Sequence, residues 1–233
     1  LSKAFDSVCH SLLLAKLKAF GFSERALKLM TNYLCDRKQR VKLDGVYSRW
    51  RTVKTGVPQG SLLGPLLFNL YMNDLNYFVE DTSLRLYADD TTGYASDTSP
   101  AILEYVINSD LKIVTNWLQH NYLQINAKKT QAMAIGPISS YAYNITLQNC
   151  NIDLTECLRI LGVTLDGKMS FKPHILEQSR KACAKAAALR KIRKFIPMDV
   201  MIRLYKAYVL LHLEYCSPLF LGISDGLSNK LED

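Results

Sequence analysis

The chain has 233 residues, 48% of them hydrophobic, and its mean hydropathy is −0.01. It is therefore long and apolar enough to bury the core of one large or two small domains, which excludes a disordered chain. Its 29 basic and 21 acidic residues leave a net charge of +8. This charge suits a polyanionic partner but does not by itself identify one.

Apolar stretches and cysteines bear on the compartment. The longest apolar runs, 62–72 and 208–223, are too short or are interrupted by polar residues and proline, so we predict no membrane span. The six cysteines form no CxxC pair and none lies near a histidine at zinc-ligand spacing, which favours reduced, mostly buried thiols in an intracellular protein. No secretory signal is visible, and a start without Met leads us to expect a piece of a longer protein.

Two helices are predicted near the amino terminus. Ser11 is a suitable N-cap for a helix over 12–20, and Ser23 is a suitable N-cap for a second helix. The apolar face of the second helix consists of Leu27, Met30 and Leu34. We expect these two helices to pack together on their apolar sides.

A basic β-hairpin is predicted over 37–55. Apolar and charged residues alternate on both sides of Asp44-Gly45, which is a strong two-residue turn signal. Its cations are Arg37, Lys38, Arg40, Lys42, Arg49, Arg51 and Lys54. Two interpretations stay open, namely a solvated charged face and a contact to a phosphate backbone.

A loop punctuated by glycine and proline over 56–65 leads into an apolar helix that continues to Met72. Ser61 can cap this helix, whose free N–H groups would favour an anionic or polar ligand. Gly60 has no Cβ to obstruct a ligand, and Gln59 offers a donor and an acceptor to a sugar, base or amide. Loops that join a strand to a helix often have this composition, so the pattern alone is weak.

Residues 84–94 predict a β-hairpin with two acids at its tip. Apolar and polar residues alternate over 84–87, and turn-forming residues follow. Asp89 and Asp90 are adjacent carboxylates, which are costly together unless a cation neutralises them. Mg²⁺ suits them because it binds carboxylate oxygens and takes further ligands from substrate phosphates and water. An isolated Asp-Asp pair is also a common polar turn, so the assignment depends on the other motifs.

Ser99-Pro100 predicts the start of a long helix with a one-sided core-facing stripe. The stripe consists of Leu103, Ile107, Leu111, Val114 and Leu118. Lys129, further on, can neutralise or protonate a departing pyrophosphate, although a lone lysine in a turn is usually solvated. Single strands are predicted at 133–135 and 158–166, the second ending in an Asp-Gly turn.

The composition shifts over 168–206, where eleven basic residues face two acidic ones, a net charge of +9. An apolar helical stripe runs along the segment, most cations lie off it, and Pro197 breaks the helix before another begins. This asymmetry favours nucleic-acid contact over a merely soluble basic helix. The candidate contact residues are Arg180, Lys181, Arg190, Lys191, Arg193 and Lys194.

Five ordered motifs resemble the successive palm motifs of reverse transcriptases, particularly those of non-LTR, LINE-type retrotransposons of the jockey-like group. They are Leu1–Asp6, Gly56–Ser61, Tyr87–Asp90, Asn126 with Lys129-Thr130, and Leu161-Gly162. The resemblance implies an α+β fold, with a palm of antiparallel sheet backed by helices over 1–166. A partial, basic helical thumb would follow over 167–233, and the fingers would be missing.

The resemblance also implies catalytic roles. Asp89, and less directly Asp90, would hold two Mg²⁺ ions, with Mn²⁺ as an alternative, and Lys129 would be the acid for pyrophosphate. Phe5 would stack under the incoming sugar and exclude a 2′-hydroxyl. The nucleotide-binding loop would comprise Pro58, Gln59 and Gly60, and the primer-grip hairpin Leu161 and Gly162.

One departure concerns the first motif. In the family an Asp stands immediately before the residue that matches Leu1 and is the other principal metal ligand, and Asp6 lies too far along to replace it. We therefore expect the parent to be an RNA-directed DNA polymerase and this piece to be inactive alone. The implied partners are an RNA template, a DNA primer and deoxynucleoside triphosphates, in the nucleus or a cytoplasmic ribonucleoprotein.

Three alternatives stay open. One is another palm polymerase, such as a group II intron or telomerase-like reverse transcriptase or an RNA-dependent RNA polymerase, although Phe5 argues against ribonucleotide use. A second is a decayed retroelement-derived module that binds nucleic acid without catalysis. A third is a structural protein without a nucleic-acid role, which would make the +9 segment and the ordered motifs coincidences.

Overall fold

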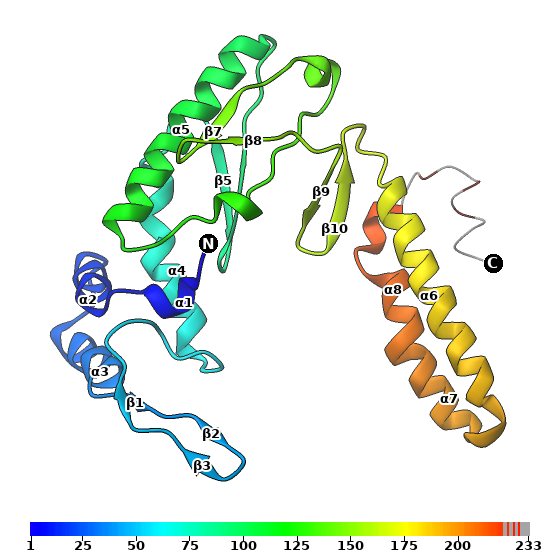
Figure 1. The fold of residues 1–233 in the computed structure, drawn as a ribbon, viewed down its shortest axis with the longest axis horizontal. Helices are drawn as coiled ribbons and strands as arrows, with labels where there is room; N and C mark the ends of the chain where they lie inside the picture. Colours follow the sequence, from blue (N-terminus) through cyan, green and yellow to red (C-terminus); the bar gives the residue numbers. More distant parts are fainter. Residues whose placement is uncertain (221–222, 224–225, 227, 229–233) are drawn as a thin grey trace. The chain divides into compact units, whose positions relative to one another are not determined.

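The computed structural model describes residues 1–220, 223, 226 and 228, and the chain divides into two units (Figure 1). The first unit comprises Leu1–Thr130 and Ala142–Ile152, and the second Gln131–Tyr141 and Asp153–Asp233. Helices and small antiparallel sheets occur together, so the predicted α+β class is confirmed. The second unit takes in residues before the predicted boundary at 166, and the palm and thumb assignments stay predictions.

Five α-helices and four pairs of short strands build the described first unit. The helices are α1 Ala4–Ser7, α2 His10–Ala19, α3 Glu24–Leu34, α4 Leu63–Met72 and α5 Pro100–His120. The antiparallel strand pairs are β1 Lys38–Gln39 with β4 Arg51–Thr52, β2 Lys42–Leu43 with β3 Val46–Tyr47, β5 Ser83–Tyr87 with β6 Asp90–Tyr94, and β7 Ile145–Leu147 with β8 Cys150–Ile152. Buried side chains of α2, α3, α4 and α5 form its core.

Several local predictions are confirmed in this unit. Ser23 caps α3, since its Oγ accepts a hydrogen bond from the Ala26 N–H at 3.3 Å. Asp44 and Gly45 form the two-residue turn between β2 and β3, both with positive φ. The apolar stripe of α5 faces the core. Helix α2 begins two residues earlier than predicted, with Cys9 rather than Ser11 at its N-cap.

A partly buried lysine joins α2 to α4. The Lys16 ammonium donates to the Tyr71 carbonyl at 2.8 Å and to Asp74 Oδ1 at 2.6 Å. It also lies 4.8 Å from the ring centroid of Tyr71 and 4.5 Å from that of Trp117. Burial lowers the pKa of Lys16, and the Asp74 carboxylate offsets part of that effect. Burial also raises the pKa of the Tyr71 phenol to about 12. The contacts with Tyr71 and Asp74 are what offset the cost of burying this charge.

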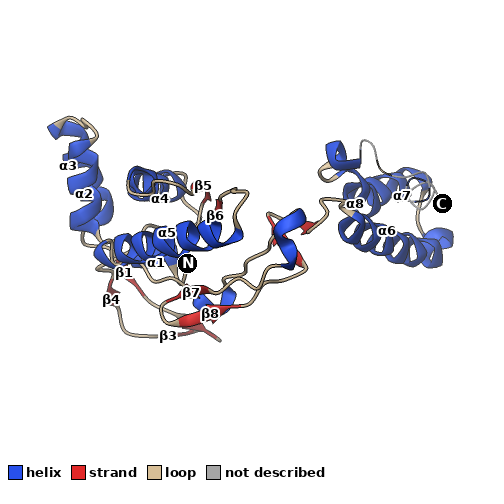
Figure 2. Ribbon diagram, turned by 90° about the horizontal axis from the view of Figure 1, so that it is seen from above, coloured by secondary structure: helices blue, strands red, loops and turns tan. Residues whose placement is uncertain are grey.

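The second unit contains a β-hairpin, which is followed by a helical hairpin. Its elements are β9 Cys157–Ile160, β10 Val163–Asp166, α6 Lys172–Ile192, α7 Met198–Tyr205 and α8 Leu211–Glu214. Figures 1 and 2 show α7 and α8 beside α6, and Pro197 precedes α7 as the predicted helix break requires. Ile175, Ala182 and Val209 are buried here, and His174 is completely buried, which lowers its pKa.

Three predictions are wrong. Residues 133–135 form no strand, because pairing there is limited to a bridge between Ala132 and Leu154. Residues 158–166 form a hairpin rather than one strand, since Leu161 and Gly162 have positive φ and reverse the chain.

The third wrong prediction concerns the cysteines, whose thiols are not mostly buried. All six cysteines are free, with Cys9 and Cys216 half-buried and the others exposed. In the described part of the chain, no helix has the length and apolar character of a membrane span.

Candidate active site

The two acids lie at the tip of the β5–β6 hairpin. Tyr87 pairs with Asp90, so Ala88 and Asp89 form a two-residue turn, and Ala88 adopts the positive φ, +51°, of mirror-image hairpin turns. Both carboxylates are exposed, and neither forms an ion pair with any residue that the structure describes. The predicted hairpin with two acids at its tip is confirmed, and both carboxylates are open to solvent.

The start of the chain runs beside this tip. The Leu1 amino group donates to the Asp89 carbonyl oxygen at 3.3 Å. The Ser2 N–H donates to the Gln124 carbonyl at 2.9 Å, in an antiparallel bridge. Lys129 is exposed, in a short turn of 3₁₀-helix five residues beyond Gln124, and forms no ion pair with Asp89 among the described residues. Residues 1–2 thus connect the acidic tip with the segment that leads to Lys129.

Phe5 is held from behind by the core. Its ring stacks on the ring of Phe68 in α4, with centroids 4.7 Å apart and planes 18° apart. Its backbone carbonyl accepts a hydrogen bond from the Val57 N–H at 2.8 Å. Phe68 is completely buried while Phe5 is only half-buried. One face of the Phe5 ring is therefore fixed against the protein, which gives the side chain a defined position.

The glycine-rich loop packs on the residues that follow Phe5. The Gly56 N–H donates to the Val8 carbonyl at 2.7 Å, and Gln59 Nε2 donates to Asp6 Oδ1 at 3.0 Å. A Cβ on Gly56, which has φ +89°, would lie 2.8 Å from both the Asp6 Cα and the Phe5 carbonyl oxygen. The lack of a side chain at Gly56 thus lets the loop pack closely on the backbone of Phe5 and Asp6.

Ser61 fixes the end of that loop at the start of α4. Its Oγ accepts hydrogen bonds from the Gly64 N–H at 2.9 Å and the Tyr33 hydroxyl at 2.9 Å, and donates to the Pro58 carbonyl at 2.7 Å. The predicted capping role is confirmed. Pro58 is half-buried, whereas Gln59 and Gly60 are exposed beside it. A Cβ on Gly60 would meet nothing within 4 Å, so this glycine borders open space.

The structure brings some of the predicted site residues together. Phe5, Asp6 and Gln59 lie together, and Leu1 lies at Asp89. Sequence reasoning discounted Asp6 as a metal ligand and missed its role as the partner of Gln59. It also missed Phe68, for which the apolar run of α4 was the available signal. No group of three or more His, Cys, Asp or Glu side chains in the described residues could hold a metal.

The predicted nucleic-acid contacts of the second unit are mostly exposed. Leu161 and Gly162 form the β9–β10 turn, where the Tyr215 hydroxyl donates to the Leu161 carbonyl. Lys181 is the partly buried cation, and it pairs with Glu177 at 2.5 Å, which lowers the pKa of Glu177. The exposed cations are Arg180, Arg190, Lys191, Arg193 and Lys194. Free positive charge therefore lies at Arg180, near the end of α6 and in the short turn that follows it.

Comparison with known proteins identifies the class. Residues 1–165 match the family described as reverse transcriptase (RNA-dependent DNA polymerase). Because the match covers more than half of the chain, the chain belongs to the reverse transcriptase family.

Particular relatives narrow this class. The chain is 29% identical, over 82% of its own length and 22% of the relative's, to the probable RNA-directed DNA polymerase from transposon BS of Drosophila melanogaster. It is 27% identical to the RNA-directed DNA polymerases from mobile element jockey of D. melanogaster (89% of this chain, 24% of the relative) and D. funebris (94% and 25%). The chain thus spans about a quarter of the length of these curated relatives. The predicted similarity to jockey-like non-LTR retrotransposon enzymes is confirmed.

Proposed function

We propose that the chain supplies the palm and the start of the thumb of an RNA-directed DNA polymerase, which extends a DNA primer with deoxynucleoside triphosphates on an RNA template. The observation that carries this proposal is the pair Asp89 and Asp90, exposed at a hairpin tip against the first residue of the chain. The palm would comprise residues 1–166, and the start of the thumb residues 167–233.

The acidic tip fits a divalent cation. Mg²⁺ binds proteins through one or two carboxylates and completes its shell with substrate phosphates and water, which Asp89 and Asp90 leave room for. Bound there, Mg²⁺ would ease proton loss from the primer 3′-hydroxyl and neutralise charge on the reacting phosphates. The Leu1 amino group lies at the Asp89 carbonyl, so a residue joined before Leu1 would lie next to the tip. An Asp in that position would add a third carboxylate there.

The other residues of the first unit would position the nucleotide. Phe5, fixed on Phe68, would present its free side to the sugar and leave no room for a 2′-hydroxyl. Gln59 has one amide hydrogen engaged by Asp6, which orients the side chain and leaves its carbonyl oxygen as an acceptor. Lys129 would reach the leaving pyrophosphate and neutralise it. The exposed cations of α6 would hold the template and primer backbones.

Primer extension tests the proposal. The chain would be given an amino-terminal extension that ends in Asp, and synthesis on an RNA template with Mg²⁺ would be compared with Asp89→Asn. We expect loss of at least about a hundredfold in rate, because a charge that stabilises the transition state is removed. The matched control is Asp81→Asn, an exposed acid two residues before the start of β5.

Two further measurements separate the roles. Binding of Mn²⁺, followed by the loss of the free-ion paramagnetic resonance signal, should weaken in Asp89→Asn and not in Asp81→Asn. Phe5→Ala should retain synthesis and accept ribonucleotides more readily. Undiminished synthesis by Asp89→Asn would rule out the proposed function, and a chain that binds RNA without any synthesis would favour the binding module.

A further inference from the structure

The basic hairpin between α3 and the glycine-rich loop is an exposed arm. This arm, residues 36–54, contains β1 to β4, and none of its residues is buried (Figure 1). Its apolar side chains face solvent too, with Val41 69%, Leu43 71% and Val46 72% exposed. Since isolated two-stranded hairpins are marginal in water, such a surface is typical of a segment that is covered by a partner.

The arm carries a strong and unneutralised positive charge. Seven basic residues stand against Asp36 and Asp44, which leaves a net charge of +5 over 19 residues. None of these cations forms an ion pair with a carboxylate in the described part of the chain. The free positive charge complements a polyanion and argues against a partner with a merely apolar surface.

A β-bulge organises the middle of the arm. The two ladders are separated by two residues on the outgoing strand but by three on the return strand, so Arg40 faces both Arg49 and Trp50. The Arg40 guanidinium lies 3.8 Å from the ring centroid of Tyr47 and 4.5 Å from that of Trp50. Bulges redirect side chains and often lie next to functional sites. Here the bulge gathers two aromatic rings around one planar cation.

The same region has the chemistry to hold bases as well as phosphates. A hollow of about 610 Å³ is lined by Gln39, Arg40, Val41, Ser48, Arg49 and Arg51. Trp50 and Tyr47, whose rings lie beside Arg40 of this lining, are 58% and 48% exposed as whole residues, which leaves them open to stack on bases. Single-stranded nucleic acid binds to this combination of cations and stacking aromatics, whereas a duplex hides the faces of its bases.

We propose that the arm binds a single-stranded segment of RNA, with bases stacked on Trp50 and Tyr47 and phosphates held by Arg40, Arg49 and Arg51. The choice of RNA over DNA rests on the proposed function, because the template of an RNA-directed polymerase is RNA. The observations on the charge, the bulge and the exposed rings do not depend on the proposed function. The arm would thus guide the part of the template that is not yet paired. Its residues are distinct from those at the acidic tip.

Binding of a labelled, unstructured 20-nucleotide RNA to the full chain tests this, by fluorescence anisotropy with chelator present and nucleotides absent. We expect Trp50→Ala to raise the Kd roughly tenfold, as loss of one stacked base does. Arg49→Ala should reduce the slope of log K against log salt by about 0.7, the value for one phosphate on a single strand. A duplex of the same length should bind more weakly than the single strand.

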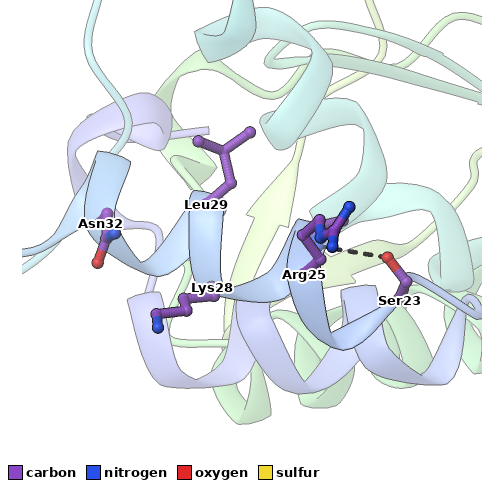
Figure 3. Close-up of a pocket in the computed structure, with 6 residues that line it drawn as sticks. Ser23, Arg25, Lys28, Leu29 and Asn32 are labelled. Carbon is purple, nitrogen blue, oxygen red and sulfur yellow. Dashed lines mark hydrogen bonds between the residues drawn. The ribbon is translucent and has the colours of Figure 1, made fainter.

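A matched control lies on α3. Arg25 and Lys28 are exposed cations on its outer face, next to Leu29 (Figure 3). Arg25→Ala changes the charge as Arg49→Ala does, and should leave the Kd within about twofold. Circular dichroism of each variant would verify that the fold is unchanged, since the arm contributes nothing to the core.

Tryptophan fluorescence gives a direct signal. The chain has two tryptophans, and Trp117 is buried in the core, so quenching by stacked bases would report on Trp50. Trp50→Phe should abolish the quenching and retain most of the affinity. Equal losses in Arg25→Ala and Arg49→Ala, unchanged affinity in Trp50→Ala, or tighter binding of the matching DNA would each overturn the proposal. Because no synthesis is measured, an inactive acidic tip would not affect the result.

Discussion

Gly56→Ala tests how closely the glycine-rich loop must approach the first motif. The added methyl would lie 2.8 Å from the Asp6 Cα, 2.8 Å from the Phe5 carbonyl oxygen and 2.9 Å from the Asp6 carbonyl oxygen. These are backbone atoms, so no flexible side chain can move aside. The hydrogen bonds from Gly56 and Val57 to the same segment, at 2.7 and 2.8 Å, would have to lengthen.

The expected loss has two parts. Alanine at φ +89° costs about 1–2 kcal/mol in backbone strain, and overpacking against fixed atoms costs about 1–3 kcal/mol more. We therefore expect Gly56→Ala to lower the free energy of unfolding by about 3–4 kcal/mol. Gly60→Ala is the matched control, because Gly60 has a similar φ of +79° with nothing within 4 Å of its Cβ position, and should cost only the backbone strain of about 1–2 kcal/mol.

Urea unfolding, followed by the fluorescence of the buried Trp117, measures both variants. The difference between them isolates the contact with Phe5 and Asp6 from the conformational preference of glycine. If Gly56→Ala and Gly60→Ala were destabilised equally, the close packing of the loop on the first motif would be refuted.

Two other predictions concern titratable side chains that are partly or completely buried. Lys16→Met should lower the free energy of unfolding of the first unit by about 2–3 kcal/mol, because it leaves Asp74 without its partner. If the ion pair is responsible, adding Asp74→Asn to Lys16→Met should restore part of that loss in urea unfolding. Burial holds the pKa of His174 below 6.5, so its contribution to stability is complete above pH 6.5 and declines as the pH falls through the lowered pKa. Thermal unfolding of the second unit should therefore depend less on pH between 7 and 5 in His174→Asn than in the unchanged chain.

Local signals predicted most of the fold of the first unit. Turns such as Asp44-Gly45 and caps such as Ser23 are determined by residues next to them in the sequence, so no knowledge of the tertiary structure was needed. The β5–β6 hairpin was predictable for the same reason, since its strands and its acidic turn are contiguous. The apolar period of α5 likewise identified its buried face.

Features that depend on distant partners were not predictable in this way. The contact of Gln59 with Asp6 joins residues 53 positions apart, and no periodicity encodes it. The apolar run 133–135 looked like a strand but found a partner only at Ala132. In the β9–β10 hairpin, Leu161 takes a positive φ that its residue type disfavours, so an apparently continuous strand reverses there. Tertiary pairing, which a single sequence does not display, decided the first two cases, and a local turn at a residue type that disfavours it decided the third.

The way in which the arm is attached has a consequence for evolution. Its two ends meet where the Val53 N–H donates to the Arg37 carbonyl at 2.8 Å, so the polypeptide departs and comes back at one place. Insertions or deletions beyond that junction would alter its reach without shifting Phe5 or Gln59. The proposed RNA-binding arm could thus change in length while the residues of the candidate active site keep their places.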